Sequence, residues 1–254
     1  MGTCVISGSA SGIGAATRQR LESAGDEVIG IDIRDAEIVA DLSKPEERSA
    51  AVAATLEKTG GRIDRLVLSA GLGELHPLPL VTSVNYFGSI RLLDGFREAL
   101  ERGEDPAAVV LCSNSARMTT FENHPYVEAL LDEDEERARK QIEEDPVTFV
   151  AYAGGKFALG LAMRRRAPAW GAAGIRLNAI APGPTDTPLL DEIADDPVRT
   201  KGLQALPNPL GRHASPAEMA NVIAFLLGND ASYVHGVILY ADGGIDAALA
   251  PDRF

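Results

Sequence analysis

The chain has 254 residues, of which 45% are hydrophobic and 24% are charged. This length and apolar fraction indicate a globular protein with a sizeable core and exclude a disordered chain. There are 24 basic residues against 37 acidic ones, and the resulting formal net charge of −13 disfavours binding to nucleic acid or to an anionic membrane surface. We therefore expect a small-molecule partner.

The two cysteines, Cys4 and Cys112, lie in apolar runs and predict buried free thiols of a reducing compartment. No uncharged apolar stretch is long enough to span a bilayer, and the N-terminal residues enter an apolar run without a basic leader. These features predict a cytoplasmic protein with no membrane segment.

Short β-branched runs alternate with longer helical patterns, which predicts βαβ units around a parallel sheet. Ser215, Pro216 and Glu218 supply an N-cap, a first-turn proline and a capping-box acid for the last helix. No internal repeat or linker divides residues 1–254, so one domain is expected. The expected strands are Thr3–Ser7, Glu27–Asp32, Ile38–Asp41, Arg65–Ser69, Ala107–Ser113, Gly174–Ala181 and Gly236–Ala241. The expected helices are Gly12–Ser23, Pro45–Lys58, Pro79–Arg102, Phe149–Trp170 and Ser215–Leu227.

Two segments interrupt the alternation of strands and helices. Residues 117–148 are densely charged and predict a mostly solvated helical insertion after the fifth strand, with apolar residues at helical spacing at Val127, Leu130, Leu131, Ala138 and Ile142. The second segment is rich in proline between Pro182 and Pro209. Such a segment predicts a long irregular stretch, and residues 183–213 are expected to cover a site as a lid.

A glycine-rich turn follows the first expected strand and opens the first helix. Gly8, Gly12 and Gly14 permit a tight turn in which the backbone can approach a pyrophosphate, and Ser11 and Ile13 flank the last two glycines. Free N–H groups at a helix N-terminus favour such an anion. The position between a strand and a helix is the context that a dinucleotide-binding fingerprint requires.

Asp32 ends the second expected strand, 24 residues after Gly8. An acid at this place can accept hydrogen bonds from both adenosine ribose hydroxyls, and it would repel a 2′-phosphate. The spacing therefore predicts NAD(H) rather than NADP(H). Arg34 lies two residues further on and partly offsets the repulsion, so we expect a preference rather than exclusivity.

Tyr152 and Lys156 are four residues apart and would share one face of a helix. A free phenol titrates near pH 10, too high for a general base near neutrality. An adjacent ammonium, together with the positive ring of an oxidised nicotinamide, would lower the pKa of Tyr152. Gly154 and Gly155 each cost about 1 kcal/mol against Ala inside a helix, which indicates close approach by another backbone or a ligand.

These motifs occur together in an order that resembles the short-chain dehydrogenase/reductase family over the whole chain. The other residues that carry the resemblance are Ala70-Gly71, Asn85, Ser113, Pro182-Gly183 and Asp242-Gly243-Gly244. Within that family, the chain is similar to the bacterial group of 3α-hydroxysteroid dehydrogenase/carbonyl reductases. The stretches that carry this narrower similarity are Gly30–Glu37, Val84–Gly88, Ala231–Gly236 and Asp242–Ala247, with the charged insertion.

The resemblance implies a single-domain, doubly wound Rossmann fold with a seven-stranded parallel sheet, which binds NAD and interconverts a secondary alcohol and a ketone. It implies that Tyr152 is the general acid/base, and that Ser113 donates a hydrogen bond to the substrate oxygen. Lys156 would hold the nicotinamide ribose, and Asn85 would bind a water that relays protons. The other residues implied to bind the cofactor are Gly8, Ser11, Gly12, Ile13, Gly14, Asp32, Ile33, Asp41, Leu42, Ala70, Gly71, Ile180, Pro182, Gly183 and Thr187.

Three departures from the family pattern stand out. Ser69 occupies a position where Asn is common, and Gly155 replaces a usual Ser before the catalytic Lys. The gap of 39 residues between Ser113 and Tyr152 is longer than in most members, so the insertion must loop out and return. Ser115 competes with Ser113 for the catalytic role because strand side chains repeat with a period of two.

Leu189 and Leu190 in the expected lid would offer apolar contacts to a hydrophobic substrate such as a steroid, without selecting for one. A 3-oxoacyl reductase is the rival enzyme, although Asp32 disfavours its usual NADPH. A non-catalytic dinucleotide sensor is the alternative of another class, and the presence of the Ser, Tyr and Lys set argues against it. The four histidines are scattered, so no metal site is expected. Because the insertion lies beside the helix that begins near Phe149, we expect a homodimer rather than a tetramer.

Overall fold

The computed structural model describes residues 2–194 and 196–252; the chain ends and residue 195 of the expected lid lie outside these ranges. At its centre is a sheet of seven parallel strands in the order β3-β2-β1-β4-β5-β6-β7. The strand order reverses between β1 and β4, where doubly wound folds bind their ligands. The strands are β1 (Thr3–Ser7), β2 (Glu27–Asp32), β3 (Ile38–Val39), β4 (Arg65–Leu68), β5 (Ala107–Leu111), β6 (Arg176–Pro182) and β7 (Ile238–Ala241).

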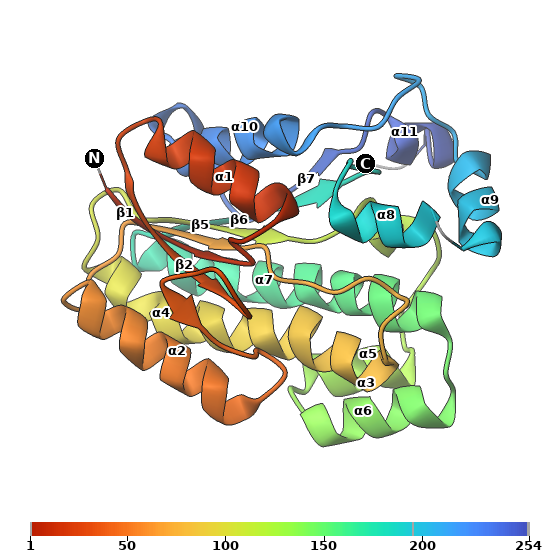
Figure 1. Ribbon diagram of the computed structural model, residues 1–254, viewed down its shortest axis with the longest axis horizontal. Helices are drawn as coiled ribbons and strands as arrows, with labels where there is room; N and C mark the ends of the chain where they lie inside the picture. Colours follow the sequence, from red (N-terminus) through yellow and green to blue (C-terminus); the bar gives the residue numbers. More distant parts are fainter. Residues whose placement is uncertain (1, 195, 253–254) are drawn as a thin grey trace.

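Helices cover both faces of this sheet (Figure 1). One layer is formed by α1 (Gly12–Glu22) and α10 (Pro216–Leu227), which pack against each other. The other face carries α2 (Pro45–Lys58), α4 (Ser89–Glu101) and α7 (Gly155–Ala172). This arrangement confirms the doubly wound single-domain fold expected from the sequence.

The alternation of side chains along each strand divides the core in two. In β1, Val5 belongs to the cluster beneath α2, α4 and α7, whereas Cys4 and Ile6 belong to the cluster beneath α1 and α10. Both cysteines are buried free thiols, as expected. Burial raises the pKa of Cys112 to about 11. Among the described residues, no helix combines the length and apolar character that a membrane crossing requires.

Two of the long helices expected from the sequence contain π-helical turns. The expected helix Pro79–Arg102 divides into α3 (Leu78–Thr82), a π-helical turn at Ser83–Gly88 and α4. The expected helix Phe149–Trp170 starts with a π-helical turn at Val150–Gly154, which leads into α7. Such turns occur often at functional sites. The capping box of Ser215 and Glu218 at α10 is confirmed.

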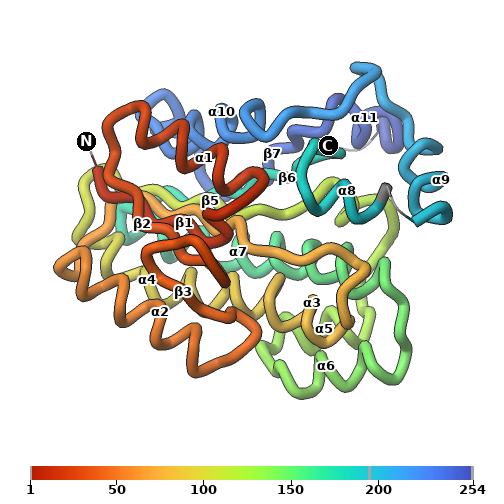
Figure 2. Tube along the Cα trace, in the orientation of Figure 1, coloured from red at the N-terminus to blue at the C-terminus, as the bar shows by residue number. Residues whose placement is uncertain are grey.

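The charged segment after β5 contains a 3₁₀ turn at Asn114–Arg117, then α5 (Pro125–Leu131) and α6 (Glu135–Glu144). We call residues 117–148 the insertion. More than half of its residues are exposed, as expected of a mostly solvated insertion, while its apolar stripe joins the main core. The buried residues of the insertion are Phe121, Tyr126, Val127, Ala129, Leu130, Ala138 and Ile142. In the Cα trace, α5 and α6 lie beside α3 and α7 (Figure 2).

The proline-rich segment, which we call the lid (residues 183–213), is also more regular than expected. It contains α8 (Pro188–Ala194) and α9 (Pro197–Ala205), each of which begins with a proline. Proline at the first helical position needs no hydrogen-bond donor, so these prolines start helices instead of breaking them. A bridge between Thr185 and Ala214 joins the two ends of the segment. A 3₁₀ turn at Asn229–Ala231 and α11 (Ile245–Leu249) complete the described elements.

Candidate active site

The glycine turn after β1 is packed too tightly for side chains at two of its positions. A Cβ atom on Gly14 would lie 1.9 Å from the carbonyl oxygen of Gly8, and one on Gly8 would lie 2.6 Å from the backbone nitrogen of Ala70. Gly8 also has a φ of 73°, in the left-handed region. The turn therefore requires glycine. The exposed Ser11 precedes α1 without a side-chain cap, which leaves the first N–H groups of the helix available to an anion.

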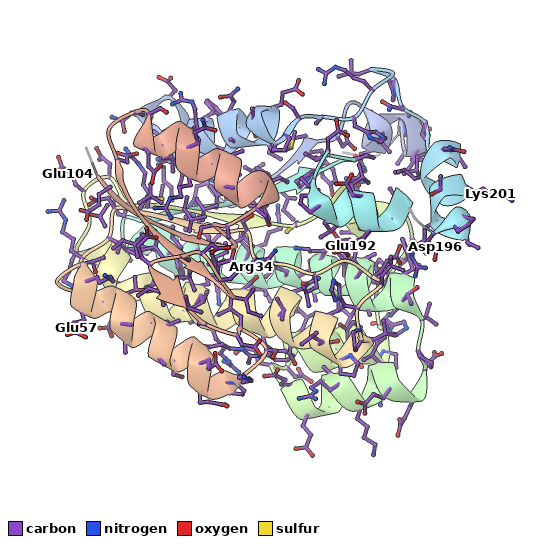
Figure 3. The ribbon with its side chains drawn as sticks, viewed as in Figure 1. Arg34, Glu57, Glu104, Glu192, Asp196 and Lys201 are labelled. Carbon is purple, nitrogen blue, oxygen red and sulfur yellow. The ribbon has the colours of Figure 1, made fainter. Side chains whose placement is uncertain are left out.

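Asp32 at the end of β2 is held beside this turn. One of its carboxylate oxygens accepts from the backbone N–H of Ala10 (2.9 Å), and the other accepts from the N–H of Ile33 (2.7 Å). The Ile33 side chain is exposed. Arg34, labelled near the middle of Figure 3, is exposed and approaches Asp35. A fixed carboxylate at this place fits the expected contact with ribose hydroxyls.

The segment after β3 carries the two residues implied to flank an adenine. Leu42 is buried, and its Cβ lies 3.1 Å from the position that a Cβ on Gly88 would take. The Asp41 carboxylate accepts from both the N–H and the hydroxyl of Ser43, and these hydrogen bonds lower its pKa. The carboxylate of Asp41 is thus directed into its own turn.

Asn85 lies in the first π-helical turn and is buried. Its side-chain oxygen accepts from the N–H of Leu72 (2.7 Å), and its side-chain nitrogen donates to the carbonyl of the same residue (3.0 Å). A Cβ on Gly71 would lie 3.4 Å from Asn85 Oδ1 and 3.6 Å from Lys156 Nζ. The structure therefore brings Gly71, Asn85 and Lys156 together beneath the carboxyl end of β4.

The opposite wall comes from the segment after β6. Gly183 donates from its N–H to the carbonyl of Ala241 (3.1 Å), and Ile180 is fully buried within the strand. The Thr187 hydroxyl donates to the carbonyl of Thr185, while its methyl group lies 3.4 Å from the position of a Cβ on Gly12. Thr187 therefore packs directly against the glycine turn.

The two serines after β5 form a chain of hydroxyl groups. Ser113 Oγ accepts from both the hydroxyl (2.9 Å) and the N–H (3.3 Å) of Ser115. A hydrogen bond also links Ser113 to Tyr152, and it lowers the pKa of the phenol. Because Ser115 supplies the donors to Ser113, the proton of Ser113 is left for the phenolic oxygen of Tyr152. Of the two serines weighed from the sequence, Ser113 is the one in contact with Tyr152.

The charge states of Tyr152 and Lys156 depend mainly on burial. Burial raises the pKa of Tyr152, more than the hydrogen bond from Ser113 lowers it, and nearby Glu74 raises it further. The lowering expected from the sequence refers to the protein with the oxidised nicotinamide bound, and it stays a prediction. Lys156 Nζ donates to the carbonyl of Leu111 (2.8 Å), and burial lowers the pKa of its ammonium. In the chain itself both groups are therefore shifted toward their neutral forms.

The lid meets the loop after β4 through two ion pairs that the sequence did not suggest. Arg199 in α9 lies 3.0 Å from Glu74, and Glu192 in α8 lies 3.4 Å from His76. Figure 3 labels Glu192 and, at the start of α9, Asp196. The side chain of Leu189 contacts the same loop at Gly73, and Leu190 is half-buried. No pattern in the sequence links residues so far apart, and only the folded lid brings them together.

Comparison with known proteins places this site in a class. Residues 142–246 match a family model described as enoyl-(acyl carrier protein) reductase. The coniferyl-alcohol dehydrogenase of Pseudomonas sp. (strain HR199 / DSM 7063) is 30% identical over 249 residues, which cover 95% of each chain. The fold, the glycine turn and these similarities agree. The chain belongs to the short-chain dehydrogenase/reductase family and is an oxidoreductase.

Two relatives are much more similar. The 3-alpha-hydroxysteroid dehydrogenase/carbonyl reductase of Comamonas testosteroni is 50% identical over 257 residues, which cover 100% of both chains. The crystal structure of the 3-alpha-hydroxysteroid dehydrogenase from Pseudomonas sp. B-0831 complexed with NADH superposes with a TM-score of 0.97 at 47% identity, covering 99% of this chain and 100% of that one. These similarities confirm the narrower resemblance drawn from the sequence.

Proposed function

We propose that this chain is an NAD(H)-dependent dehydrogenase that interconverts secondary alcohols and ketones, with hydroxysteroids and other hydrophobic carbonyl compounds as substrates. The observation that carries the proposal is the hydrogen-bonded pair of the buried Ser113, after β5, and the half-buried Tyr152. The names of the relatives at 50% and 47% identity, both hydroxysteroid dehydrogenases, support the substrate class, and the NADH in one of them supports the cofactor.

The residues of the cleft fit a nicotinamide dinucleotide. We assign the pyrophosphate to the glycine turn and the first N–H groups of α1, and the adenosine ribose to the fixed carboxylate of Asp32. Lys156, Asn85 and Thr187 line the nicotinamide end. When bound, the dinucleotide supplies or accepts the two electrons that the reaction requires.

The roles of the side chains follow from their protonation states. In reduction, the Tyr152 hydroxyl donates its proton to the substrate oxygen, and the Ser113 hydroxyl turns from Tyr152 to donate to that oxygen and stabilise the charge that develops there. In oxidation, the phenolate of Tyr152 takes the alcohol proton. Because burial raises the pKa of Tyr152, the neutral acid dominates near pH 7. Reduction should therefore be favoured near neutrality, and the oxidation rate should rise toward alkaline pH.

The test is a panel of 3-oxosteroids, 3α-hydroxysteroids, aromatic ketones, small polar alcohols and a 3-oxoacyl thioester, each assayed with both cofactors. We expect turnover of the hydrophobic compounds with NAD(H), and loss of about 10²–10⁴-fold in kcat for Tyr152→Phe while NADH binding persists. NADH binding without turnover of any compound would indicate a sensor. Turnover restricted to the thioester or to small polar alcohols would overturn the substrate class.

We also propose that the enzyme is a cytoplasmic homodimer. The buried free thiols of Cys4 and Cys112 suit a reducing compartment. Glu133 of the insertion forms ion pairs with Arg91 of α4 and Arg166 of α7, so it covers part of the face that those two helices would otherwise offer to a second copy. This supports a dimer over a tetramer. Light scattering should give the mass of two chains, and the mass of four would refute the proposal.

A further inference from the structure

The insertion packs directly against the turn that carries Tyr152. A Cβ on Gly154 would lie 3.4 Å from the ring of Phe121 and 3.5 Å from the side chain of Val127. A Cβ on Gly155 would lie 3.6 Å from the hydroxyl of Tyr126. The expectation that a backbone or a ligand approaches these two glycines is therefore wrong. The groups that approach them are side chains of the insertion.

The hydroxyl of Tyr126 forms the polar contacts in this otherwise apolar packing. Tyr126 is 1% exposed. Its hydroxyl lies 3.2 Å from the carbonyl of Ala151, to which it donates, and 2.9 Å from the hydroxyl of Thr82. Ala151 immediately precedes Tyr152 in the second π-helical turn, and Thr82 immediately precedes the first. One buried hydroxyl thus connects the two irregular turns of the site.

We infer that Tyr126 is a positioning residue for the proposed reaction, because its hydroxyl bridges the two π-helical turns that carry Asn85 and Tyr152. It touches neither substrate nor cofactor. It acts by fixing the backbone from which those two side chains project. A buried hydrogen bond to a backbone carbonyl restrains a turn that lacks regular α-helical geometry. The inference deepens the proposed function and rests on it.

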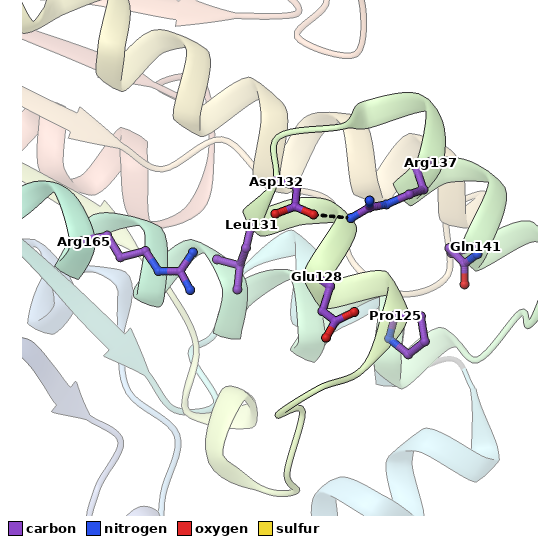
Figure 4. Close-up of a pocket in the computed structure, with 7 residues that line it drawn as sticks. All are labelled: Pro125, Glu128, Leu131, Asp132, Arg137, Gln141 and Arg165. Atoms are coloured by element: carbon purple, nitrogen blue, oxygen red, sulfur yellow. Dashed lines mark hydrogen bonds and ion pairs between the residues drawn. The ribbon is translucent and has the colours of Figure 1, made fainter.

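The outer face of the insertion differs from this inner face. A groove of about 520 Å³ lies there, lined by Pro125, Glu128 and Leu131 of α5 together with Asp132, Arg137, Gln141 and Arg165 (Figure 4). The side chains of Asp132 and Arg137, which both line this groove, form an ion pair. Tyr126 follows Pro125 in the chain, yet its ring points inward to the core. The bridge is therefore separated from solvent by α5 itself.

Loss of the bridge should affect the titration of Tyr152. Besides burial and Ser113, the groups that influence its pKa are Glu74 from the loop after β4 and Cys112 just after β5. Lys156 lies one turn further along the same helix. The hydrogen bond from Ser113 lowers the pKa of Tyr152. If the turn shifts and this bond weakens, the pKa rises. The alkaline rise of the oxidation rate should then move to higher pH.

Tyr126→Phe removes only the hydroxyl and tests the inference. We expect kcat to fall about tenfold, since a displacement of 1 Å in a reacting group can cost up to about 10²-fold. The Kd for NADH should be unchanged, and the pH at which the oxidation rate rises should move to a higher value. Thr82→Val, which leaves the contact with Ala151 intact, should have the same effects to a smaller extent.

Tyr86→Phe is the matched control. Tyr86 is equally buried and lies next to Asn85, but its hydroxyl has no hydrogen-bond partner among the described residues. Its removal should leave kcat and the pH at which the oxidation rate rises unchanged. If Tyr126→Phe lowers the melting temperature but leaves kcat and this pH at their wild-type values, Tyr126 is merely structural and the inference is wrong.

Hydrogen exchange gives a readout that does not need turnover. The amides of residues 150–155 should exchange faster in Tyr126→Phe than in Tyr86→Phe, whereas those of β1 and α1 should not change. Equal exchange of the two variants in residues 150–155 would overturn the inference. An inactive wild type would instead refute the proposed function, and the exchange comparison would still decide whether the bridge restrains the turn.

Discussion

The insertion and the lid both interrupt the regular α/β alternation, but they are attached to the molecule in different ways. The insertion contributes a buried apolar stripe to the main core, and its Glu135 forms a two-bonded ion pair with Arg48, which is only 2% exposed. No residue of α9 in the lid is buried, and Val198 is 78% exposed. The lid meets the loop after β4 through ion pairs at the surface.

This difference shows that charge density in a sequence does not measure solvation. The insertion is the more highly charged of the two segments, yet it packs against the turn that carries Tyr152. Arg48, its ion-pair partner, also donates to the carbonyls of Leu42 and Ser83 and so links the insertion to the segment proposed to bind the cofactor. A buried segment can fix the geometry of the catalytic groups. A segment held at the surface can open for substrate.

The largest effect is expected for Arg48→Met. This change leaves Glu135 without its partner and frees three backbone carbonyls, so the free energy of unfolding should fall by about 3–5 kcal/mol. Denaturant unfolding measures it. Arg137→Met, which removes an exposed ion pair from the same insertion, is the control and should have little effect. A loss for Arg48→Met as small as that of the control would remove the distinction between a buried and a surface attachment.

A smaller effect is expected from acid. Burial raises the pKa of Glu135, but the hydrogen bonds from Arg48 and Ser83 and the positive charges of Arg48 and Arg139 together outweigh this and hold the pKa below its usual value. A carboxyl whose pKa is lower in the folded state stabilises the protein above its unfolded pKa of about 4.3, and this contribution disappears as the pH falls through the folded value. Unfolding free energies measured from pH 6 downward should therefore fall less steeply in Glu135→Gln.

The control for the acid experiment is Glu143→Gln, an exposed change on the same helix, which should retain the wild-type slope. If Glu135→Gln and Glu143→Gln show the same acid dependence, the attachment of the insertion is not sensitive to the protonation of Glu135.

The smallest effect on stability is expected for Arg199→Gln in the lid. Its ion pair with Glu74 lies near the surface, so the free energy of unfolding should change by less than about 1 kcal/mol. The KM for the ketone should rise, because the lid closes less often over the substrate. Steady-state kinetics measure this. Lys201→Gln, on the exposed side of α9, is the matched control, and an unchanged KM in Arg199→Gln would mean that this pair does not hold the lid.

The sequence predicted the sheet, the glycine turn and the shared face of Tyr152 and Lys156 because each depends on local patterns, whereas Asn85 and Ser113 were implied only by the resemblance to the family. β-Branched runs mark the strands, and the glycine turn needs its glycines for steric reasons. Position along the chain then places these groups at the carboxyl ends of neighbouring parallel strands. The proximity of residues that are far apart in the chain follows once the strand order is known.

The π-helical turns were not predicted, since one extra residue per turn hardly changes the hydrophobic period of a long helix. The helices of the lid were missed because Pro188 and Pro197 were interpreted as breakers, although they open α8 and α9. The rise in the pKa of Tyr152 that burial causes in the chain itself was not predicted, because no pattern of residue types reveals how deeply a side chain is buried.

The two ends of the lid lie close together, and this affects how the substrate range of the fold can change. Asp186 donates from its N–H to the carbonyl of Ala214, and the N–H of Ala214 donates to the carbonyl of Pro184, so the segment leaves and rejoins the sheet at one point. A loop closed in this way folds over the opening of the active site without contributing a strand to the sheet. The segment can therefore be exchanged as a unit. Replacing residues 187–213 with those of another family member would change which substrates bind and would leave the catalytic residues in place.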